Sequence, residues 1–202
     1  MSVAAVVLAA GAGARFGGDK LRAELDGRPI LAHVLAAARA ARLDPIVVVV
    51  PPDGSLDDLD LGELRRVVNP NPAEGLSSSV RLGLRALDLD ATVEAAVLLP
   101  GDQPRVRTAV IATLIAALDA SPATPFVVPR YAADGGSNPV VARRSVWRLA
   151  DELAGDRGFG PVLASHSELV RFVAVDGANP DVDTAADLRR LAEPDAASSD
   201  VS

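Results

Sequence analysis

A glycine-rich segment carrying two basic side chains follows the first apolar run of the chain. It reads Leu8-Ala9-Ala10-Gly11-Ala12-Gly13-Ala14-Arg15-Phe16-Gly17-Gly18-Asp19-Lys20. Glycines leave backbone amides free to bind an anion, and Arg15 and Lys20 add positive charge. The segment therefore favours a triphosphate loop in which Lys20 neutralises charge during phosphoryl chemistry. Its spacing fits neither a P-loop nor the dinucleotide Gly-x-Gly-x-x-Gly motif. A plain glycine-rich connector is the alternative.

Asp102 stands in a rigid turn, Pro100-Gly101-Asp102-Gln103-Pro104, directly after another apolar run. A carboxylate at the end of a buried strand suits a magnesium ligand. The alternative is a β-turn in which the carboxylate only bonds neighbouring amides.

A second group of carboxylates lies near the end of the chain. Asp181 and Asp183 alternate with Val182, so in extended chain they would share one face and could hold the same metal ion. Helix capping by Asp183 or Thr184 is the alternative, and we expect Asp187 to be structural.

A polar loop, 69–79, precedes a predicted helix. It offers the amide of Asn69, the backbone of Gly75 and the hydroxyls of Ser77, Ser78 and Ser79 to a base or ribose. The same groups could serve only to cap the helix.

These segments need a framework that brings them together. Apolar runs predict strands at 3–8, 46–50, 95–99, 126–129 and 169–175, with extended chain near 67–68 and 139–142. Helices are predicted at 29–42, 77–87, 106–118, 145–153, 159–166 and 184–191. This alternation predicts an α/β sandwich with a mostly parallel sheet. Ligands of such sheets bind at the carboxyl ends of the strands, where the glycine-rich loop and Asp102 fall.

Composition sets the class of protein. The 202 residues predict one domain over 1–193 and a disordered tail over 194–202, which is rich in Ser, Ala and Asp. Cysteine is absent, so any catalytic metal must bind oxygen or imidazole. The net charge of −7 argues against nucleic-acid binding. No apolar run reaches the roughly 20 residues of a membrane span and no signal peptide is visible, so we expect a cytoplasmic protein without a membrane partner.

Six segments, in order, carry a resemblance to a known family. They are LAAGAGARFGGDK, NPNPAEGLSSSV, LLPGDQP, GGSNPVV, GDRG and DVDTAADL. From about Val3 to Leu191 the chain resembles the MobA-like NTP transferases, and among them the molybdenum cofactor cytidylyltransferases. The resemblance implies a Rossmann-like three-layer α/β/α sandwich of the nucleotide-diphospho-sugar transferase type.

The resemblance also implies a reaction. With Mg²⁺ as cofactor, CMP would pass from CTP to the phosphate of molybdopterin, releasing pyrophosphate without a covalent protein intermediate. CTP is favoured over GTP because related guanylyltransferases typically carry Gly in place of Ala10. A transient contact with a recipient molybdoenzyme would follow.

Residue roles follow from the same resemblance. Catalysis would fall to Arg15, Lys20 and Asp102, and metal binding to Asp102, Asp181 and Asp183. The residues expected to contact the acceptor are Gln103, Gly136 and Asn138. The residues expected to contact the nucleotide are Leu8, Ala9, Ala10, Gly11, Gly13, Arg15, Lys20, Asn69, Gly75, Ser77, Ser78, Ser79 and Asp102.

One motif departs from the family. Asn138, in Gly136-Ser137-Asn138-Pro139, stands where the family often has the histidine of Gly-His-Pro. An amide can bond a phosphate or pterin but cannot titrate near neutral pH, so we expect no general base here and the acceptor stays open. His33, His166 and Trp147 lie outside the motifs and are expected to be structural or surface residues.

Other functions fit parts of the pattern. The same fold could use GTP or another NTP with a sugar phosphate, a polyol phosphate or a phospholactate-like acid. A noncatalytic molybdenum cofactor carrier or chaperone needs no complete set of metal ligands. A dinucleotide-binding oxidoreductase, with Asp53 on the ribose, has the wrong glycine spacing.

Overall fold

The structure, a computed structural model, describes residues 1–11, 13, 15–133 and 136–193. The predicted tail at 194–202 lies outside the described residues, as do Ala12 and Ala14 of the glycine-rich loop and Asp134 and Gly135.

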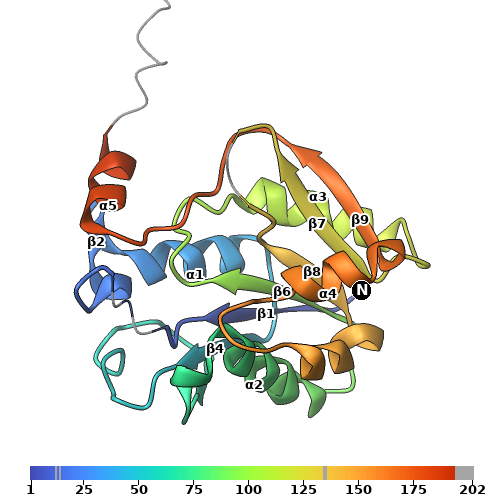
Figure 1. Cartoon of the computed structure of the whole chain (residues 1–202), viewed down its shortest axis with the longest axis horizontal. Coiled ribbons are helices and arrows are strands. Elements are labelled where there is room, and N and C mark those ends of the chain that lie inside the picture. Colours follow the sequence, from blue (N-terminus) through green and yellow to red (C-terminus); the bar gives the residue numbers. More distant parts are fainter. Residues whose placement is uncertain (12, 14, 134–135, 194–202) are drawn as a thin grey trace, which may run out of the picture.

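A seven-stranded, mostly parallel sheet forms the middle layer (Figure 1), as the sequence predicts. In spatial order its strands are β5 (Arg65–Val68), β4 (Ile46–Val50), β1 (Val3–Leu8), β6 (Ala95–Pro100), β8 (Val140–Arg143), β7 (Phe126–Tyr131) and β9 (Val170–Val175). The first four run parallel, β8 is antiparallel to both β6 and β7, and β9 is parallel to β7.

The strand order reverses at β1, and this reversal places the site. The chain runs from β1 to β4 and β5 on one side and then returns to β6 on the other side of β1. In open α/β sheets the ligand crevice opens at such a reversal, outside the carboxyl ends of the strands. Here Leu8 pairs with Pro100, so the glycine-rich loop and the turn of Asp102 leave the sheet side by side.

Helices cover both faces of the sheet, which confirms the predicted three layers (Figure 1). On one face lie α1 (Ile30–Ala40) and α3 (Thr108–Asp119). On the other lie α2 (Leu76–Asp88), the 3₁₀ helix η3 (Arg144–Glu152) and α4 (Gly160–Ser165). A fifth helix, α5 (Ala185–Ala192), lies against the short strand β2 (Glu24–Leu25).

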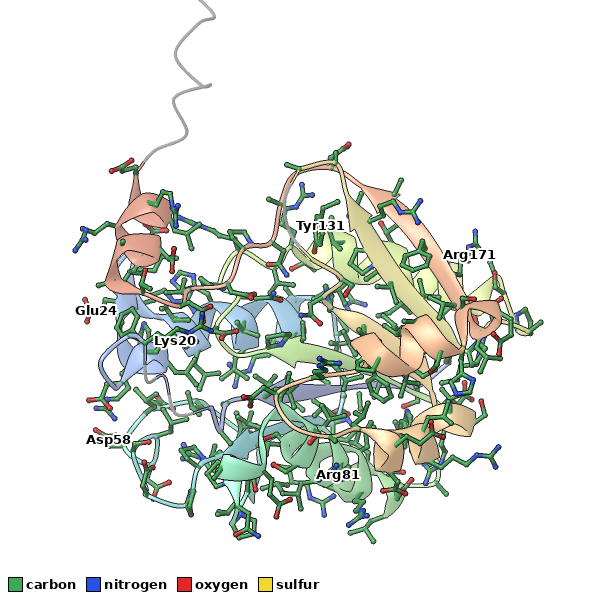
Figure 2. All side chains as sticks on the ribbon, in the orientation of Figure 1. Lys20, Glu24, Asp58, Arg81, Tyr131 and Arg171 are labelled. Atoms are coloured by element: carbon green, nitrogen blue, oxygen red, sulfur yellow. The ribbon has the colours of Figure 1, made fainter. Side chains whose placement is uncertain are left out.

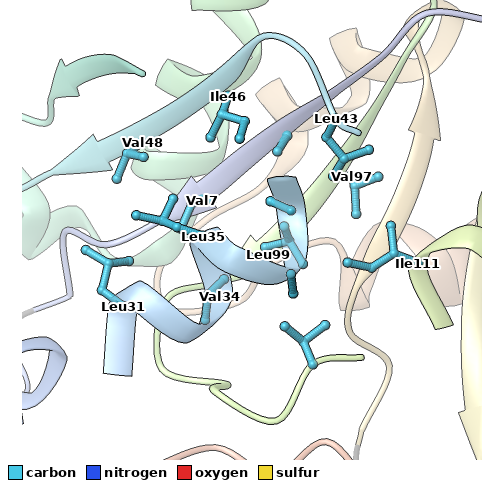
Figure 3. Packing of buried hydrophobic residues seen from close by; sticks show 14 of the residues in the cluster. Val7, Leu31, Val34, Leu35, Leu43, Ile46, Val48, Val97, Leu99 and Ile111 are labelled. Atoms are coloured by element: carbon cyan, nitrogen blue, oxygen red, sulfur yellow. The ribbon is translucent and has the colours of Figure 1, made fainter. Parts of the chain in front are cut away.

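Two apolar clusters hold the layers together. In one, shown in Figure 3, Leu31, Val34 and Leu35 of α1 pack on Val7 and on the neighbouring strands. In the other, α2 packs closely on β1 because Gly83 has no side chain; a Cβ there would collide with Val6. Successive residues of β1 point alternately into the two clusters, as expected for a central strand.

Short elements account for most differences from the predicted ones. The helix expected at 145–153 is the 3₁₀ helix η3. Its buried residues Trp147 and Ala150, with Leu153 just after its end, recur at a spacing of three that suits three residues per turn. Three further 3₁₀ turns are η1 (Lys20–Arg22), η2 (Pro72–Glu74) and η4 (Ser167–Leu169), and β2 forms a hairpin with β3 (Arg28–Pro29). Within the described part of the chain, no helix combines the length and apolar character that crossing a bilayer requires.

Candidate active site

A cavity of about 500 Å³ opens at the carboxyl ends of β1 and β6. The predicted site residues on its wall are Leu8, Ala10, Gly11, Gly13, Arg15, Lys20, Gly75, Ser79, Asp102, Asn138, Asp181 and Asp183. The structure thus brings together residues that are up to 175 positions apart, from Leu8 to Asp183.

Lys20 lies at the centre of the charged end of this cavity. It is the first residue of η1, which buried Leu21 anchors to the core. Its Nζ lies 2.7 Å from Asp102 Oδ2 and 3.3 Å from Asp183 Oδ1. Arg15 pairs with the other oxygen of Asp183 at 3.1 Å. Figure 2 shows Lys20 beside the segment that enters α5.

Two backbone hydrogen bonds bring the carboxylates to Lys20. The amide of Gly101 donates to Leu8 O at 2.9 Å, which extends the pairing of β1 and β6 to the turn of Asp102. The amide of Val182 donates to Asp102 O at 2.9 Å. Val182 is fully buried, so Asp181 and Asp183 on either side of it face the cavity.

Asp187 is structural, as predicted, and it fixes the backbone beside Asp183. Thr184 and Asp187 form a capping box at the start of α5. The Asp187 carboxylate accepts from Thr184 N at 2.7 Å and from Asp183 N at 3.1 Å. The carboxylate also accepts a hydrogen bond from the Thr184 hydroxyl. This bond, which has the largest effect, and the two bonds from backbone amides hold the pKa of Asp187 below its usual range.

Asp181 has a different environment from the other two acidic residues. Its carboxylate accepts a hydrogen bond from Gln103 Nε2. Although solvent reaches the side chain, the surrounding protein desolvates it in part and raises its pKa; Asp102 and Asp183 add to this effect, whereas the bond from Gln103 opposes it. Negative charge at this end of the cavity is therefore only partly balanced.

The three residues expected to contact the acceptor lie in different places. Asn138 lies on the cavity wall. Gln103 is buried behind the wall and touches the site through Asp181. Gly136 lines a separate shallow pocket beside Tyr131. Acceptor contact by each of the three residues stays a prediction, and of the three only Asn138 lines the cavity.

The polar loop before α2 mainly builds its own turn. Asn69, which is 1% exposed, donates from Nδ2 to Ser78 Oγ at 2.8 Å and to Ser79 Oγ at 3.0 Å. The amide of Ser77 donates to Gly155 O at 3.1 Å. Of the residues proposed from this loop, Gly75 and Ser79 line the cavity, whereas Asn69, Ser77 and Ser78 do not; nor does Ala9 of the first loop.

Some residues of the site escaped the sequence prediction. Asp156 lines the cavity because the loop of Gly155 crosses closely over Gly75, where a Cβ would lie 2.6 Å from the Asp156 amide nitrogen. The GDRG motif marks this loop, but nothing in it indicates which wall it joins. Leu21, Pro72, Ala73, Leu76 and Pro100 add apolar lining.

The residues with no predicted role in the site have structural partners. His33 Nε2 lies 2.7 Å from Leu25 O, and Trp147 Nε1 donates to Ala142 O at 3.1 Å. His166 lies 3.7 Å from both Glu152 and Glu168. Asp53 accepts from Ser55 N at 3.0 Å within a turn.

The donor set fits a hard divalent cation in part. Among the described residues no group of three or more acidic, histidine or cysteine side chains is arranged as a metal site. Asp102 and Asp183 nevertheless converge on one cation, the Lys20 ammonium. The wall also carries Arg15 and Lys20 against four carboxylates, so a bound triphosphate would need a further cation. Two carboxylate oxygens completed by phosphate and water are usual for Mg²⁺.

Comparisons with known proteins find the same fold in solved structures. A crystal structure of the homologue of Mycobacterium tuberculosis Rv0371c from Mycobacterium sp. superposes with a TM-score of 0.82 at 33% identity, covering 95% of both chains. Rv0371c in complex with manganese superposes with a TM-score of 0.78 at 32% identity, covering 95% of this chain and 98% of that one.

A named enzyme is also similar. The 2-C-methyl-D-erythritol 4-phosphate cytidylyltransferase of Cereibacter sphaeroides is 37% identical over 142 residues, which cover 64% of this chain. The match spans only 59% of the length of that enzyme. Its name specifies methylerythritol phosphate rather than molybdopterin.

The family description matches most of the chain. The MobA-like NTP transferase domain covers residues 5–170, from β1 to the start of β9, and so includes the glycine-rich loop, Asp102 and Asn138. The fold, the cavity and this match lead to one conclusion: the chain belongs to the MobA-like NTP transferase domain family, a family of nucleotidyltransferases.

Proposed function

We propose that this protein transfers CMP from CTP to the phosphate of a small-molecule acceptor and releases pyrophosphate. The observation that carries the proposal is the position of Lys20, whose Nζ lies between Asp102 and Asp183 at the carboxyl ends of β1 and β6. A cation flanked by two metal-compatible carboxylates, beside a glycine-rich loop, is suited to a triphosphate.

The reaction needs little covalent chemistry from the protein. An oxygen of the acceptor phosphate attacks the α-phosphorus of CTP, the bond from that phosphorus to the bridging oxygen breaks, and pyrophosphate leaves with the electron pair. Lys20 and Arg15 would exchange their carboxylate partners for phosphate oxygens. A divalent cation held by Asp102 and Asp183 would supply further charge neutralisation.

Asn138 is consistent with this chemistry. A phosphate monoester is already anionic near neutral pH, so its oxygen attacks without losing a proton to the protein. The amide on the cavity wall can orient that phosphate by hydrogen bonding, and it cannot act as a base. The absence of a histidine at this position is therefore compatible with transfer.

CTP is proposed as the donor on two grounds. The opening Leu8-Ala9-Ala10-Gly11 has the form seen in cytidylyltransferases, and Leu8, Ala10 and Gly11 all line the cavity. The named relative is likewise a cytidylyltransferase. GTP and other NTPs are the alternatives.

Two acceptors have specific support. The order of the motifs supports molybdopterin, which we propose first. The name of the relative from Cereibacter sphaeroides supports 2-C-methyl-D-erythritol 4-phosphate. Because that match spans only 59% of the length of the enzyme, its name supports a cytidylyltransferase without fixing the acceptor.

The test is pyrophosphate release with each of CTP, GTP, ATP and UTP, with and without Mg²⁺, in the presence of molybdopterin, methylerythritol phosphate or neither. We expect release that requires CTP, metal and one of the acceptors. Release with another NTP would correct the nucleotide. Tight binding of molybdopterin without release under any condition would replace the enzyme by a carrier.

A further inference from the structure

A chain of hydrogen bonds lies beneath the acceptor end of the cavity. The Tyr131 hydroxyl donates to the backbone carbonyl of Asn138 at 3.0 Å. Asn179 Nδ2 donates to the same carbonyl at 3.3 Å and to Gln103 Oε1 at 2.9 Å. Gln103 Nε2 then donates to Asp181. The chain links the two groups on the acceptor wall, Asn138 and Asp181.

Asn179 is the residue on which this chain depends. It is 1% exposed and does not line the cavity, so no ligand touches it. It nevertheless bonds to the backbone carbonyl of one wall residue, Asn138, and to Gln103, the partner of the other, Asp181. Among the residues that the structure describes, its Oδ1 atom is buried without a hydrogen-bond partner. Packing alone would favour an apolar side chain here, so the two donated bonds are what the amide contributes.

The hydrogen bond from Asn179 sets the orientation of the Gln103 side-chain amide. A glutamine amide has an acceptor end and a donor end. Because Gln103 Oε1 accepts a hydrogen bond from Asn179, Gln103 Nε2 faces Asp181. The reverse orientation would place the amide oxygen against the carboxylate, which is repulsive. Asn179 therefore sets the donor that Asp181 receives.

Tyr131 completes the support from the other side. Burial raises the pKa of its phenol to about 12, so at neutral pH the hydroxyl keeps its proton and remains a donor. The hydroxyl donates to the backbone carbonyl of Asn138, which also accepts a hydrogen bond from Asn179. Two donors on one carbonyl hold the backbone of the wall residue in place.

We infer that Asn179 is a positioning residue for the acceptor half of the site. Through Gln103 it orients Asp181, and through the Asn138 carbonyl it fixes the amide that faces the acceptor phosphate. The inference rests on the proposed transfer reaction, because it names the substrate whose binding Asn179 supports.

Asn69 offers a matched control. It is also an asparagine with 1% exposure and also donates two bonds from Nδ2, but its partners lie at the start of α2, on the other side of the cavity. Asn179→Ala should raise the KM for the acceptor by about 10-fold or more and leave the KM for CTP within about twofold. Asn69→Ala should instead raise the KM for CTP and leave the KM for the acceptor within about twofold. Equal changes in both KM values in each variant would show a general loss of structure and overturn the inference.

Asn179→Asp tests the donors specifically. The carboxylate has nearly the same shape but no N–H to donate, so it should not restore the acceptor KM. Restoration to the wild-type value would overturn the inference.

A second readout does not depend on activity. In the wild type, the side-chain amide protons of Gln103 should exchange slowly with solvent by NMR; Asn179→Ala should remove this protection, whereas Asn69→Ala should keep it. Protection that survives in Asn179→Ala contradicts the inference. If the wild type transfers from no NTP, the proposed function fails while the NMR result still decides whether Asn179 orients Gln103.

Discussion

Lys20 illustrates how one side chain can reveal a site. Its ammonium bonds to two carboxylates that come from the end of β6 and from the segment before α5. Each carboxylate has its backbone fixed, one through Gly101 and the other through Asp187. This rigidity suits catalysis by charge placement, which depends on preorganised groups.

At this scale we predict that Asp102→Ala and Lys20→Ala each lower kcat/KM by about 100-fold or more, because each removes charge stabilisation at the reacting phosphates. Both should fold, since their side chains lie at the cavity rather than in the core. Steady-state kinetics and circular dichroism are the measurements.

Asp151→Ala is the control, because Asp151 is an exposed acidic residue that pairs with Arg85 away from the cavity. It should retain wild-type kinetics. Wild-type rates in both site variants would remove Lys20 and Asp102 from the active site.

The residues that the sequence missed share a physical cause. The motifs predicted Lys20, Asp102 and Asn138 at the cavity because each lies in a distinctive loop near a strand. Asp156 and Asn179 depend instead on contacts between loops far apart in the chain. Local patterns carry no information about such contacts, so these two could not be predicted.

At the scale of elements, the start of α2 depends on a close crossing of two loops. Gly75 has φ of +87°, and a Cβ there would lie 2.6 Å from Asp156 N and closer still to the Gly155 carbonyl. We predict that Gly75→Ala lowers the free energy of unfolding by about 1–3 kcal/mol. It should also raise the KM for CTP, because Gly75 lines the cavity.

Gly160→Ala is the matched control, because Gly160 begins α4 and a Cβ there would meet nothing within 4 Å. Urea unfolding of both variants is the measurement. A Gly75 variant as stable as the Gly160 variant would show that the crossing is not tight.

The start of α5 should give a pH-dependent contribution to stability. Because the pKa of Asp187 is lowered in the folded protein, its stabilisation is present above the unfolded pKa near 3.8 and is lost as pH falls through the folded pKa. Asp187→Asn should therefore be less stable than wild type at pH 7, and the difference should shrink below about pH 4.

Urea midpoints measured between pH 3 and pH 7 test this. A difference between Asp187→Asn and wild type that stays constant over the whole range would mean that the carboxylate charge contributes nothing to the cap.

The sequence predicted long elements better than short ones. β1 and β4 are uninterrupted apolar runs that mark buried strands, and the helices α1 to α3 have enough residues to show a period. The hairpin of β2 and β3 has two residues per strand, which is too few. Its Asp26-Gly27 turn, with both residues at positive φ, was the one available signal.

At the scale of the molecule, the site is formed only when the two halves of the sheet are assembled. Its wall draws on β1, η1, the start of α2, the end of β6 and the segments before β8 and α5. Any ligand that binds this wall stabilises the folded state relative to the unfolded chain.

We therefore predict that CTP with Mg²⁺ at 100 times its Kd stabilises the wild type by about 2.7 kcal/mol, measured as a shift in thermal unfolding. Asp102→Ala should lose the part of the shift that requires the metal. A shift that is the same with and without metal in the wild type would contradict the proposed cation site.

The most direct test of nucleotidyl transfer follows the phosphorus atoms. The protein is incubated with Mg²⁺, the acceptor and CTP labelled either at the α- or at the γ-phosphate, and the products are separated. If the protein is a nucleotidyltransferase, α-label appears in the acceptor product and γ-label only in pyrophosphate. Transfer of the γ-label to the acceptor would make the protein a kinase, and γ-label released as orthophosphate would make it a hydrolase; either result would contradict nucleotidyl transfer.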